Sequence, residues 1–294
     1  MSEQDWLAQR FEEHRRRLRA VAYRMLGSMS EAEDAVQEAW LRLSGSEASE
    51  IENLAGWLTT VVARVSLNML RSRAVRREEP LGPHLPDPII DRADGVDPEH
   101  EALLADSVGL ALLVVLETLT PAERLAFVLH DMFGVPFGEI APLIDRSPQA
   151  ARQLASRARR RVRAQPTTPD VDVSAQRDVI NAFLAAAREG DFDALVATLD
   201  PDVVLRADGG AALAALSAEV RGAPQVARRA LIWSRVDLSL RPALVNGVAG
   251  VVVTRNDAVF TIASVIVRNG KIAEMDFFSD PERLARLDLT ILDG

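Results

Sequence analysis

The sequence contains no cysteine, a single tyrosine and, at position 271, its only lysine. The absence of cysteine excludes disulfide bridges, cysteine-ligated zinc sites and thiol nucleophiles. No apolar run approaches the roughly 20 residues that a membrane-spanning helix needs. Residues 1–10 also lack the apolar stretch of a secretory signal. We therefore expect an intracellular, cytoplasmic protein with no membrane segment.

Charge is plentiful but unevenly distributed. Charged residues make up 26% of the 294 residues and hydrophobic residues 48%, which is enough apolar material for folded cores. The net charge of −9 argues against a uniformly basic nucleic-acid binder. However, four arginines fall within 71–77 and six within 152–163, whereas residues 78–106 carry nine carboxylates and one arginine. Two cationic blocks therefore flank an acidic segment.

The first half of the chain shows helical periodicity in two blocks, 5–77 and 101–165. Between them, residues 78–100 combine five prolines with acidic residues. That composition favours an extended linker without a core of its own. We therefore expect two all-α domains joined by an acidic, proline-rich linker.

Two helix starts are readable within these blocks. Ser30 and Glu33 have the spacing of a capping box. Thr120, Pro121 and Glu123 have the order of an N-cap residue, a proline at the first helical position and an acidic first turn. We expect a helix to begin at each place.

Residues 170–294 have a different pattern. Helices at about 174–188 and 191–199 precede strand-like runs, which fall at 203–207, 236–245, 248–254, 258–267 and 272–278. The pairs Asn246-Gly247 and Asn269-Gly270 are typical of tight hairpin turns. The sequence therefore predicts a separate α+β domain at 170–294.

The segment 135–162 has the pattern of a helix–turn–helix. Ala151, Leu154 and Ala158 are expected to face the partner helix. The exposed side of that second helix then carries arginine and glutamine, the residue types that read guanine and adenine edges in the major groove. These outward residues are Gln149, Arg152, Gln153, Ser156 and Arg157, with Arg159 to Arg163 behind them for phosphates. An ordinary helical hairpin with a solvated basic face is the alternative.

A second constellation lies on the helix expected to follow Ser30. Asp34, Gln37 and Glu38 are neighbours on one helical face, ahead of Trp40. In isolation, this arrangement indicates no more than an exposed acidic surface.

A third constellation lies between Asn53 and Arg77. It combines Trp57 with Arg64, Asn68 and Arg71 on one long helix. An aromatic side chain among cationic and amide groups suits an unstacked nucleic-acid strand, whose bases stack and whose phosphates pair. Trp57 considered alone fits a core position better.

Taken together, these motifs resemble the extracytoplasmic-function sigma factors of bacterial RNA polymerase. The resemblance rests on Asp34 to Trp40 and Asn53 to Arg77, which are similar to sigma region 2, and on Leu119 to Arg124 with Ile140 to Arg161, which are similar to region 4. It implies a sigma factor that binds core polymerase, at its clamp helices and flap, and directs promoter recognition and opening. Catalysis then stays with the polymerase.

The resemblance also implies roles for individual residues. Core-polymerase binding falls on Asp34, Gln37, Glu38 and Trp40; capture and opening of the −10 element on Asn53, Trp57, Arg64, Asn68 and Arg71; and reading of the −35 element on Ser147, Pro148, Gln149, Arg152, Gln153 and Arg157. No catalytic residue, metal site or cofactor is implied.

The C-terminal domain resembles the SnoaL-like (NTF2-like) cone, and the chain therefore resembles the sigma-J-like group. Three motifs carry this resemblance: Leu85-Pro86-Asp87-Pro88 in the linker, Asp208-Gly209-Gly210 in the cone, and the C-terminal signature Asp280-Pro281-Glu282-Arg283-Leu284. In the linker, His84 stands where the group typically has tryptophan. The resemblance implies a regulatory domain acting in cis, with a small-molecule ligand left open.

Two other functions stay open at this point. One is a helix–turn–helix transcription regulator that works without core polymerase. The other is a SnoaL-like enzyme with a DNA-binding appendage. All four histidines and the tyrosine precede residue 170, so an enzyme would depend on carboxylates. The candidates are Asp200, Asp202, Asp208, Glu219, Asp237, Glu274 and Asp276.

Overall fold

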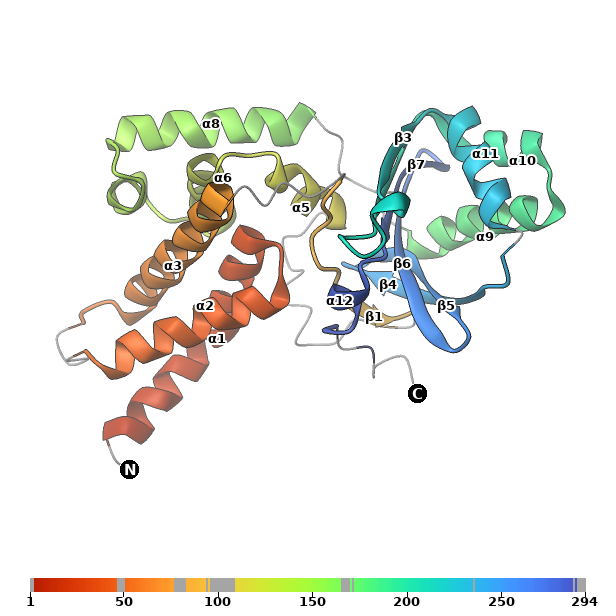
Figure 1. The fold of residues 1–294 in the computed structure, drawn as a ribbon. Helices are drawn as coiled ribbons and strands as arrows, with labels where there is room; N and C mark the ends of the chain where they lie inside the picture. The colour runs from red at the N-terminus through yellow and green to blue at the C-terminus, as the bar shows by residue number, and fades with distance from the viewer. Residues whose placement is uncertain are drawn as a thin grey trace. The chain divides into compact units, whose positions relative to one another are not determined.

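The computed structural model divides into two compact units (Figure 1). It describes residues 3–46, 51–76, 83–93, 95, 109–164, 170, 172–234, 236–287 and 289. The first unit comprises Met1–Glu79, Pro98–Asp106 and Leu112–Pro166, and the second comprises Pro80–Asp97, Ser107–Ala111 and Thr167–Gly294. Most of the expected linker therefore belongs to the second unit.

The first unit is all-helical in the part that is described. Its longer helices are α1 (Glu3–Leu26), α2 (Met29–Ser44), α3 (Leu54–Arg76), α6 (Pro121–Phe127) and α8 (Pro148–Ala164), together with α5 (Gly109–Glu117) from Leu112 onward. A π-helical turn at Val128–Met132, the short helix α7 (Phe137–Ile140) and a 3₁₀ turn at Ala141–Ile144 lie between α6 and α8. No helix in the described ranges is long and apolar enough to cross a bilayer.

One of the two expected helix starts is confirmed and the other was misplaced. Thr120 and Glu123 form a complete capping box at the start of α6. Helix α2 begins two residues before the expected position, because Ser28 rather than Ser30 accepts the Glu31 backbone N–H. The Ser28 and Ser30 hydroxyls lie 3.1 Å apart. Ser30 therefore sits inside the first turn, where its hydroxyl supports the cap instead of forming it.

A buried arginine joins the N-terminal and C-terminal helices of the first unit. Arg124 is only 2% exposed. Its Nε donates to the Arg24 carbonyl at 3.0 Å and its Nη1 to Glu117 at 2.8 Å. Nearby, Arg17 Nη2 donates to the Phe133 carbonyl at 3.1 Å. These contacts tie α1 to the α6 region, because a buried guanidinium requires acceptors for its donors.

The second unit is an α+β domain built on one mixed, seven-stranded sheet in the order β1-β4-β5-β6-β7-β2-β3. The strands are β1 (Ile90–Arg92), β2 (Leu199–Asp208), β3 (Ala218–Arg221), β4 (Ser239–Val245), β5 (Val248–Arg255), β6 (Ala258–Arg268) and β7 (Lys271–Phe278). The helices are α9 (Val173–Glu189), α10 (Phe192–Thr198), α11 (Ala223–Trp233) and α12 (Pro281–Leu284). Only the β2–β7 pair is parallel within this described sheet.

The hairpin predictions are confirmed. Asn246 and Gly247 have φ angles of 51° and 78°, and Asn269 and Gly270 have 53° and 70°. Positive φ at both central residues is the type I′ geometry that matches strand twist. These turns connect β4 to β5 and β6 to β7.

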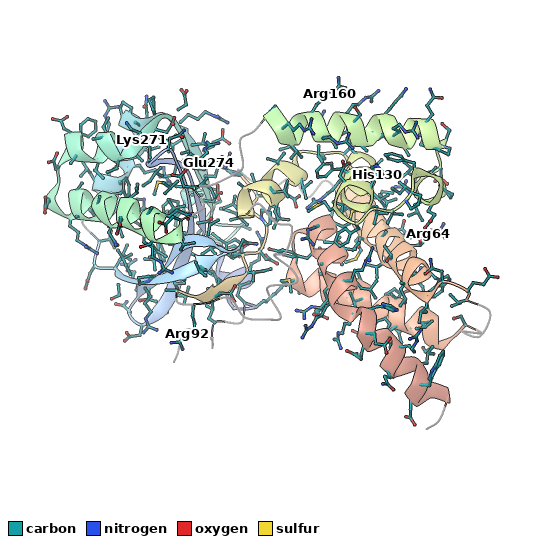
Figure 2. All side chains as sticks on the ribbon, turned by 180° about the vertical axis from the view of Figure 1, so that it is seen from behind. Arg64, Arg92, His130, Arg160, Lys271 and Glu274 are labelled. Carbon is teal, nitrogen blue, oxygen red and sulfur yellow. The ribbon has the colours of Figure 1, made fainter. Side chains whose placement is uncertain are left out.

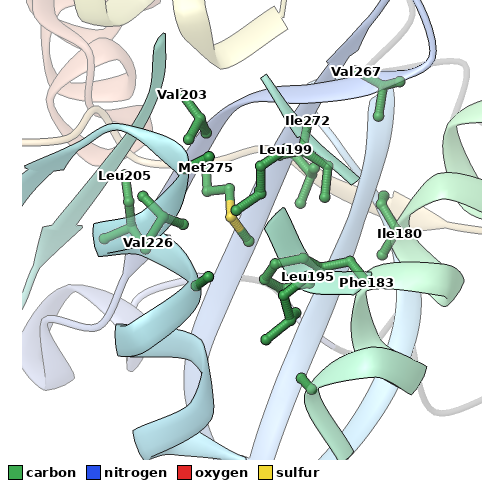
Figure 3. Packing of buried hydrophobic residues seen from close by; sticks show 14 of the residues in the cluster. Ile180, Phe183, Leu195, Leu199, Val203, Leu205, Val226, Val267, Ile272 and Met275 are labelled. Carbon is green, nitrogen blue, oxygen red and sulfur yellow. The ribbon is translucent and has the colours of Figure 1, made fainter. Parts of the chain in front are cut away.

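The core of the second unit lies between the helices and one face of the sheet (Figure 3). Ile180 and Phe183 from α9 and Val226 from α11 point toward Met275 and Ile272 on β7. Because side chains alternate along a strand, the next residues of the same strands point to the opposite face. The two faces of this sheet therefore carry different chemistry.

The expected linker contributes a strand to this sheet. Ile90–Arg92 pairs antiparallel with β4 at the sheet edge. Leu85 to Ile90 are all buried. The side-chain amide of Asn246 accepts from Ile89 N–H, and the Ile89 carbonyl accepts from Asn246 N–H. The segment is extended, as its composition predicts, but it is packed into the second unit.

Candidate nucleic-acid interface

The last helix of the helix–turn–helix presents a polar stripe. Ala151, Ala155 and Ala158 are fully buried on one side of α8. The expected inward position of Leu154 was wrong by one residue, since Leu154 is half-buried and Ala155 takes its place. The opposite side is exposed as expected and carries Gln149, Arg152, Gln153, Ser156 and Arg157. Small alanines allow α8 to approach its partner closely and leave the long polar side chains outside.

The start of α8 is set by Ser147 and Pro148. The Ser147 hydroxyl accepts the Ala150 backbone N–H at 3.2 Å. Pro148 occupies the first helical position, where a missing N–H costs nothing. Both residues are exposed. A helix start offers uncommitted backbone N–H groups and a positive dipole end, which suit phosphate contacts.

Arg152 lies over an aromatic ring. Its guanidinium carbon is 5.5 Å from the centre of the Phe137 ring, and the His130 ring lies 3.8 Å from the same ring. The His130 Nδ1 is 3.0 Å from the Val135 carbonyl, which fixes that ring in turn. Cation–π contact with a supported ring limits the directions in which Arg152 can extend.

The trailing arginines of α8 fall into two groups. Arg159 donates to Asp131 at 2.7 Å and Arg161 to Glu123 at 2.9 Å, so both are committed to the fold. Within the described part of the chain, no carboxylate pairs with Arg157, Arg160 or Arg163. Figure 2 labels Arg160 on the outer side of α8. These three side chains are therefore the better candidates for phosphate contacts.

Helix α3 presents a second stripe. Arg64, Asn68 and Arg71 are exposed at steps of four and three residues, and the half-buried Trp57 lies seven residues before Arg64. This spacing places all four on one helical face. Leu58, Val62 and Leu67 are buried on other sides of the same helix. The structure thus brings together four of the five residues expected at the −10 element.

Asn53, the fifth residue expected at the −10 element, caps the start of α3. Its side-chain oxygen accepts the Gly56 N–H at 3.0 Å, and its carbonyl accepts the Trp57 N–H. It therefore begins α3 and orients Trp57. Arg73, which belongs to the same cationic block, reaches the Leu26 carbonyl and the Glu31 carboxylate. That arginine connects α3 to the start of α2.

Helix α2 exposes a mixed stripe. Asp34 and Gln37 are exposed, and Leu41 continues the same face with 57% of its surface accessible. Glu38 is half-buried and accepts from Arg42 at 2.9 Å. Trp40 is half-buried, and its ring centre lies 5.2 Å from that of Phe11. It therefore packs α2 against α1. Leu41 was not predicted as a site residue, although its spacing from Asp34 and Gln37 already places it on the same helical face.

The linker motif and the cone motif meet within the second unit. Asp208 is 2% exposed. Its Oδ2 accepts from the Leu85 N–H at 2.9 Å and from Arg283 Nη1 at 3.0 Å. Arg283 also donates to Asp87 at 2.8 Å and to the Leu85 carbonyl at 2.6 Å. We call Asp87, Asp208 and Arg283 the linker clamp. The sequence placed Arg283 in a C-terminal motif but did not predict these contacts, because its partners are remote in the chain.

The two glycines after Asp208 are required by close approach. A Cβ on Gly209 would lie 2.2 Å from the Leu213 carbonyl oxygen. Gly210 has φ +59, and a Cβ there would lie 2.2 Å from the Asp280 carboxylate. The Gly210 N–H donates to Asp208 Oδ1 at 3.0 Å. Both glycines therefore allow the turn that fixes Asp208. Pro86 and Pro88, which flank Asp87 in the chain, are both buried.

A buried ionic cluster lies on the same sheet. Arg206 Nη1 donates to Glu274 at 3.1 Å and to Asp276 at 3.0 Å. Burial raises the pKa of Asp276 to about 6, and Glu274 and Glu219 add to this rise while Arg206 opposes it. Asp276 and Glu274 alternate with the core residues Met275 and Phe277 along β7. These carboxylates therefore face away from the helix-covered core.

Comparison with known families identifies the first unit in two parts. Residues 10–76 match the Sigma-70 region 2 family, and residues 109–162 match Sigma-70 region 4. The ECF RNA polymerase sigma factor SigJ of Mycobacterium tuberculosis is 40% identical over 93% of this chain and 91% of its own length. The chain belongs to the ECF sigma factors.

Other relatives agree with this assignment. The probable ECF sigma factor SigI of M. tuberculosis is 35% identical, with 97% of each chain covered. The crystal structure of M. tuberculosis SigJ superposes with a TM-score of 0.75 at 36% identity, covering 96% of this chain and 99% of that one. The expected order of two helical sigma domains followed by an α+β domain is confirmed.

Membership in the sigma family also locates the stripes. The α2 and α3 stripes lie within the region 2 match, and the α8 stripe lies within the region 4 match. The cone lies outside both family models but inside the full-length similarity to SigJ. The cone is therefore shared with these full-length relatives and is not part of the minimal sigma fold.

Proposed function

We propose that this sigma factor binds core RNA polymerase through α2 and contacts promoter DNA through α3 and α8. Family membership supports the assembly with polymerase, and the exposed stripes support the assignment of residues. The observation that carries the proposal is the pairing of two exposed cationic and amide stripes, on α3 and α8, in one chain. A helix–turn–helix regulator without polymerase is not favoured, because it leaves the α2 and α3 stripes without a role.

The α3 stripe fits a single-stranded element. Trp57 offers a stacking surface, Arg64 and Arg71 offer positive charge, and Asn68 offers an amide that pairs with base edges. The α8 stripe fits duplex DNA, because a helix with Arg152, Gln153 and Arg157 at its exposed face enters the major groove. These two stripes correspond to −10 opening and −35 reading.

The α2 stripe fits a protein partner. Asp34 and Gln37 are followed by the exposed Leu41, and protein–protein interfaces combine apolar contacts with a polar rim. Glu38 with Arg42 borders this stripe, and Trp40 holds the helix against Phe11. We therefore assign Asp34, Gln37 and Leu41 to contact with polymerase and Trp40 to support.

The cone, in this proposal, regulates the sigma domains in cis through the linker. Residues 83–92 are held in the second unit by strand pairing and by the linker clamp. Only residues 77–82 then connect α3 to this fixed segment, and six residues span at most about 20 Å. A released linker has a much longer reach. The clamp therefore limits how far region 2 moves from the cone.

Transcription in a reconstituted system tests this function. Purified core polymerase would be combined with the full-length chain, with a chain lacking residues 170–294, and with the full-length R283A variant. Transcripts initiated on sheared genomic DNA of the encoding organism would then be mapped by sequencing. We expect polymerase-dependent start sites that share two sequence elements, and a changed yield for the truncated and R283A proteins.

The matched control is R286A, since Arg286 is exposed on the segment that follows α12. It should transcribe like the original protein. Absence of any chain-dependent start site, even after truncation, contradicts the promoter role. Identical yields from full-length, truncated and R283A proteins contradict cis regulation only.

A further inference from the structure

The second unit contains a partly open cavity of about 220 Å³. Its wall is formed by α9, α11 and the concave side of the sheet, including Phe183, Trp233, Phe260 and Met275. Alanines at 207 and 263 leave the space that larger side chains would fill. Protein interiors are normally packed without voids of this size, so an apolar cavity of this volume is a candidate ligand site.

Among the described residues, the wall holds no acid or base suited to catalysis. None of the seven carboxylates considered from sequence lines the cavity, and all seven lie in the described part of the chain. Glu274 and Asp276 belong to the opposite side of β7, while Met275 and Phe277 line the cavity. The chemistry of this wall therefore favours binding over turnover.

Each hydroxyl group in the described part of the wall donates a hydrogen bond to another group of the protein. Thr261 donates to the Phe278 carbonyl at 3.0 Å, and Ser279 donates to the Thr261 hydroxyl at 2.7 Å. Ser234 donates to the Leu231 carbonyl at 3.0 Å. A ligand that requires hydroxyl donors would have to break these bonds. Among the described residues, the remaining side-chain donor capacity of the wall lies in the two arginines and the indole N–H of Trp233.

Arg229 is the charged side chain best placed to use that capacity. It is half-buried, lines the cavity, and donates from Nη2 to the Leu216 carbonyl at 3.3 Å. A guanidinium carries five N–H donors, so most of them are left for another acceptor. No carboxylate of the described residues pairs with it. Arg188, the other charged wall residue in the described part, is exposed.

We propose that this cavity binds a small organic acid whose apolar body fills the cone and whose carboxylate pairs with Arg229. An apolar protein cavity of about 150 Å³ holds one benzene molecule. A volume of about 220 Å³ therefore admits a single substituted ring or a short alkyl chain. Arginine binds carboxylates in bidentate fashion, which selects acids over alcohols and amines of the same shape.

Binding of this ligand would stabilise the linker clamp, and its effect on transcription rests on the proposed function. Ala207 lines the cavity, and the next residue, Asp208, holds Leu85 and Arg283. Ser279 also lines the cavity, and its backbone N–H donates to the Asp208 carbonyl at 2.7 Å. Filling the cavity should therefore stabilise the strand ends that hold the linker.

Calorimetric titration of the full-length protein tests the proposal. Three probes share one body and differ in the end group: 4-phenylbutyrate, 4-phenyl-1-butanol and 4-phenylbutylamine. We expect the acid to bind at least about tenfold more tightly than the alcohol, and the amine to bind most weakly. Trp233 lines the cavity and is the sole tryptophan after residue 57, so its fluorescence provides a second signal.

Two variants and one control locate the site. R229Q should reduce the affinity for the acid to that for the alcohol and leave the alcohol unchanged. R228Q is the matched control, because Arg228 is exposed on the same helix and lies outside the wall. A230F places a ring inside the cavity and should weaken all three probes, with circular dichroism verifying its fold.

Some results would overturn the proposal. Equal affinity for the acid and the alcohol, or tighter binding of the amine, contradicts the role of Arg229. Failure of all three probes to bind at millimolar concentration contradicts a ligand cavity. The comparison of probes uses the unmodified protein, so it stands even if a variant misfolds. Transcription is a separate measurement, so loss of the proposed promoter role would leave these binding results intact.

Discussion

Arg283 and Asp87 are 196 positions apart in the sequence, yet their Nε and Oδ1 atoms lie 2.8 Å from each other. The same guanidinium reaches Asp208 and the Leu85 carbonyl, and it stacks on the Phe278 ring at 4.5 Å. One side chain thus connects the linker, the end of β2 and the end of β7. This arrangement makes the linker part of the cone.

Removing the Arg283 guanidinium should release the linker. R283A leaves two buried carboxylates, Asp87 and Asp208, without their shared cation. Loss of one partner from a buried ion pair typically costs about 3–5 kcal/mol. We expect faster amide hydrogen exchange at Leu85 and Ile89, with R286A as the control. Unchanged exchange at both amides would show that strand pairing alone holds the linker.

Removing side chains of the α8 stripe should impair duplex recognition without affecting polymerase assembly. A good bidentate base contact contributes about 1–3 kcal/mol, so R152A or R157A should lower −35-dependent initiation by about 5- to 150-fold. R10A serves as the control, because Arg10 is exposed on α1 and pairs with Glu13. Co-purification with core polymerase should be equal for all four proteins. A normal rate of initiation in both α8 variants would refute the assignment of this stripe.

Changes on α2 should have the opposite effect. L41S removes an exposed apolar side chain, and D34N with Q37A removes the polar groups beside it. Because these groups are exposed, folding stability should change by less than about 0.5 kcal/mol. We expect weaker capture by immobilised core polymerase and unchanged binding to promoter duplex. W40A should instead lower the thermal stability of the helical unit, since Trp40 packs on Phe11.

Asp276 should make stability depend on pH. Its pKa is raised to about 6 in the folded protein, chiefly by burial, from 3.8. The folded state therefore binds the proton more tightly than the unfolded state, and this stabilisation is lost as the pH rises through about 6. D276N removes the effect, so its free energy of unfolding relative to the original should increase between about pH 4.5 and about pH 7.5. A shift of about two units corresponds to up to about 3 kcal/mol.

Urea denaturation of the two proteins at each pH measures this difference. D237N is the control, because Asp237 is exposed and should give no relative change. Asp276 is faced by Arg206, Glu274 and Glu219, and these three groups are kept in both proteins. A constant difference between D276N and the original across the pH range would contradict the raised pKa.

Local patterns in the sequence were sufficient for much of this protein. The Asn-Gly pairs predict both hairpins because φ preferences belong to single residues. The Thr120 cap could also be predicted, and is confirmed, because its partner Glu123 lies only three residues away. The exposed faces of α3 and α8 follow from helical spacing, so the sequence alone groups the candidate DNA-contacting residues. Such spacing can be wrong by one residue: Leu154 was predicted to face inward, whereas Ala155 is the buried residue.

Features that depend on distant partners were decided only by tertiary packing. Strands β1 and β3 are short, and a strand of three or four residues has no periodicity to recognise. Arg73 and Arg124 have the pattern of surface cations in the sequence, because their acceptors lie on other helices. The clamp around Arg283 and the cavity beside Arg229 arise where residues far apart in the chain converge. Sequence encodes local conformation directly, whereas such long-range contacts exist only once the elements have packed.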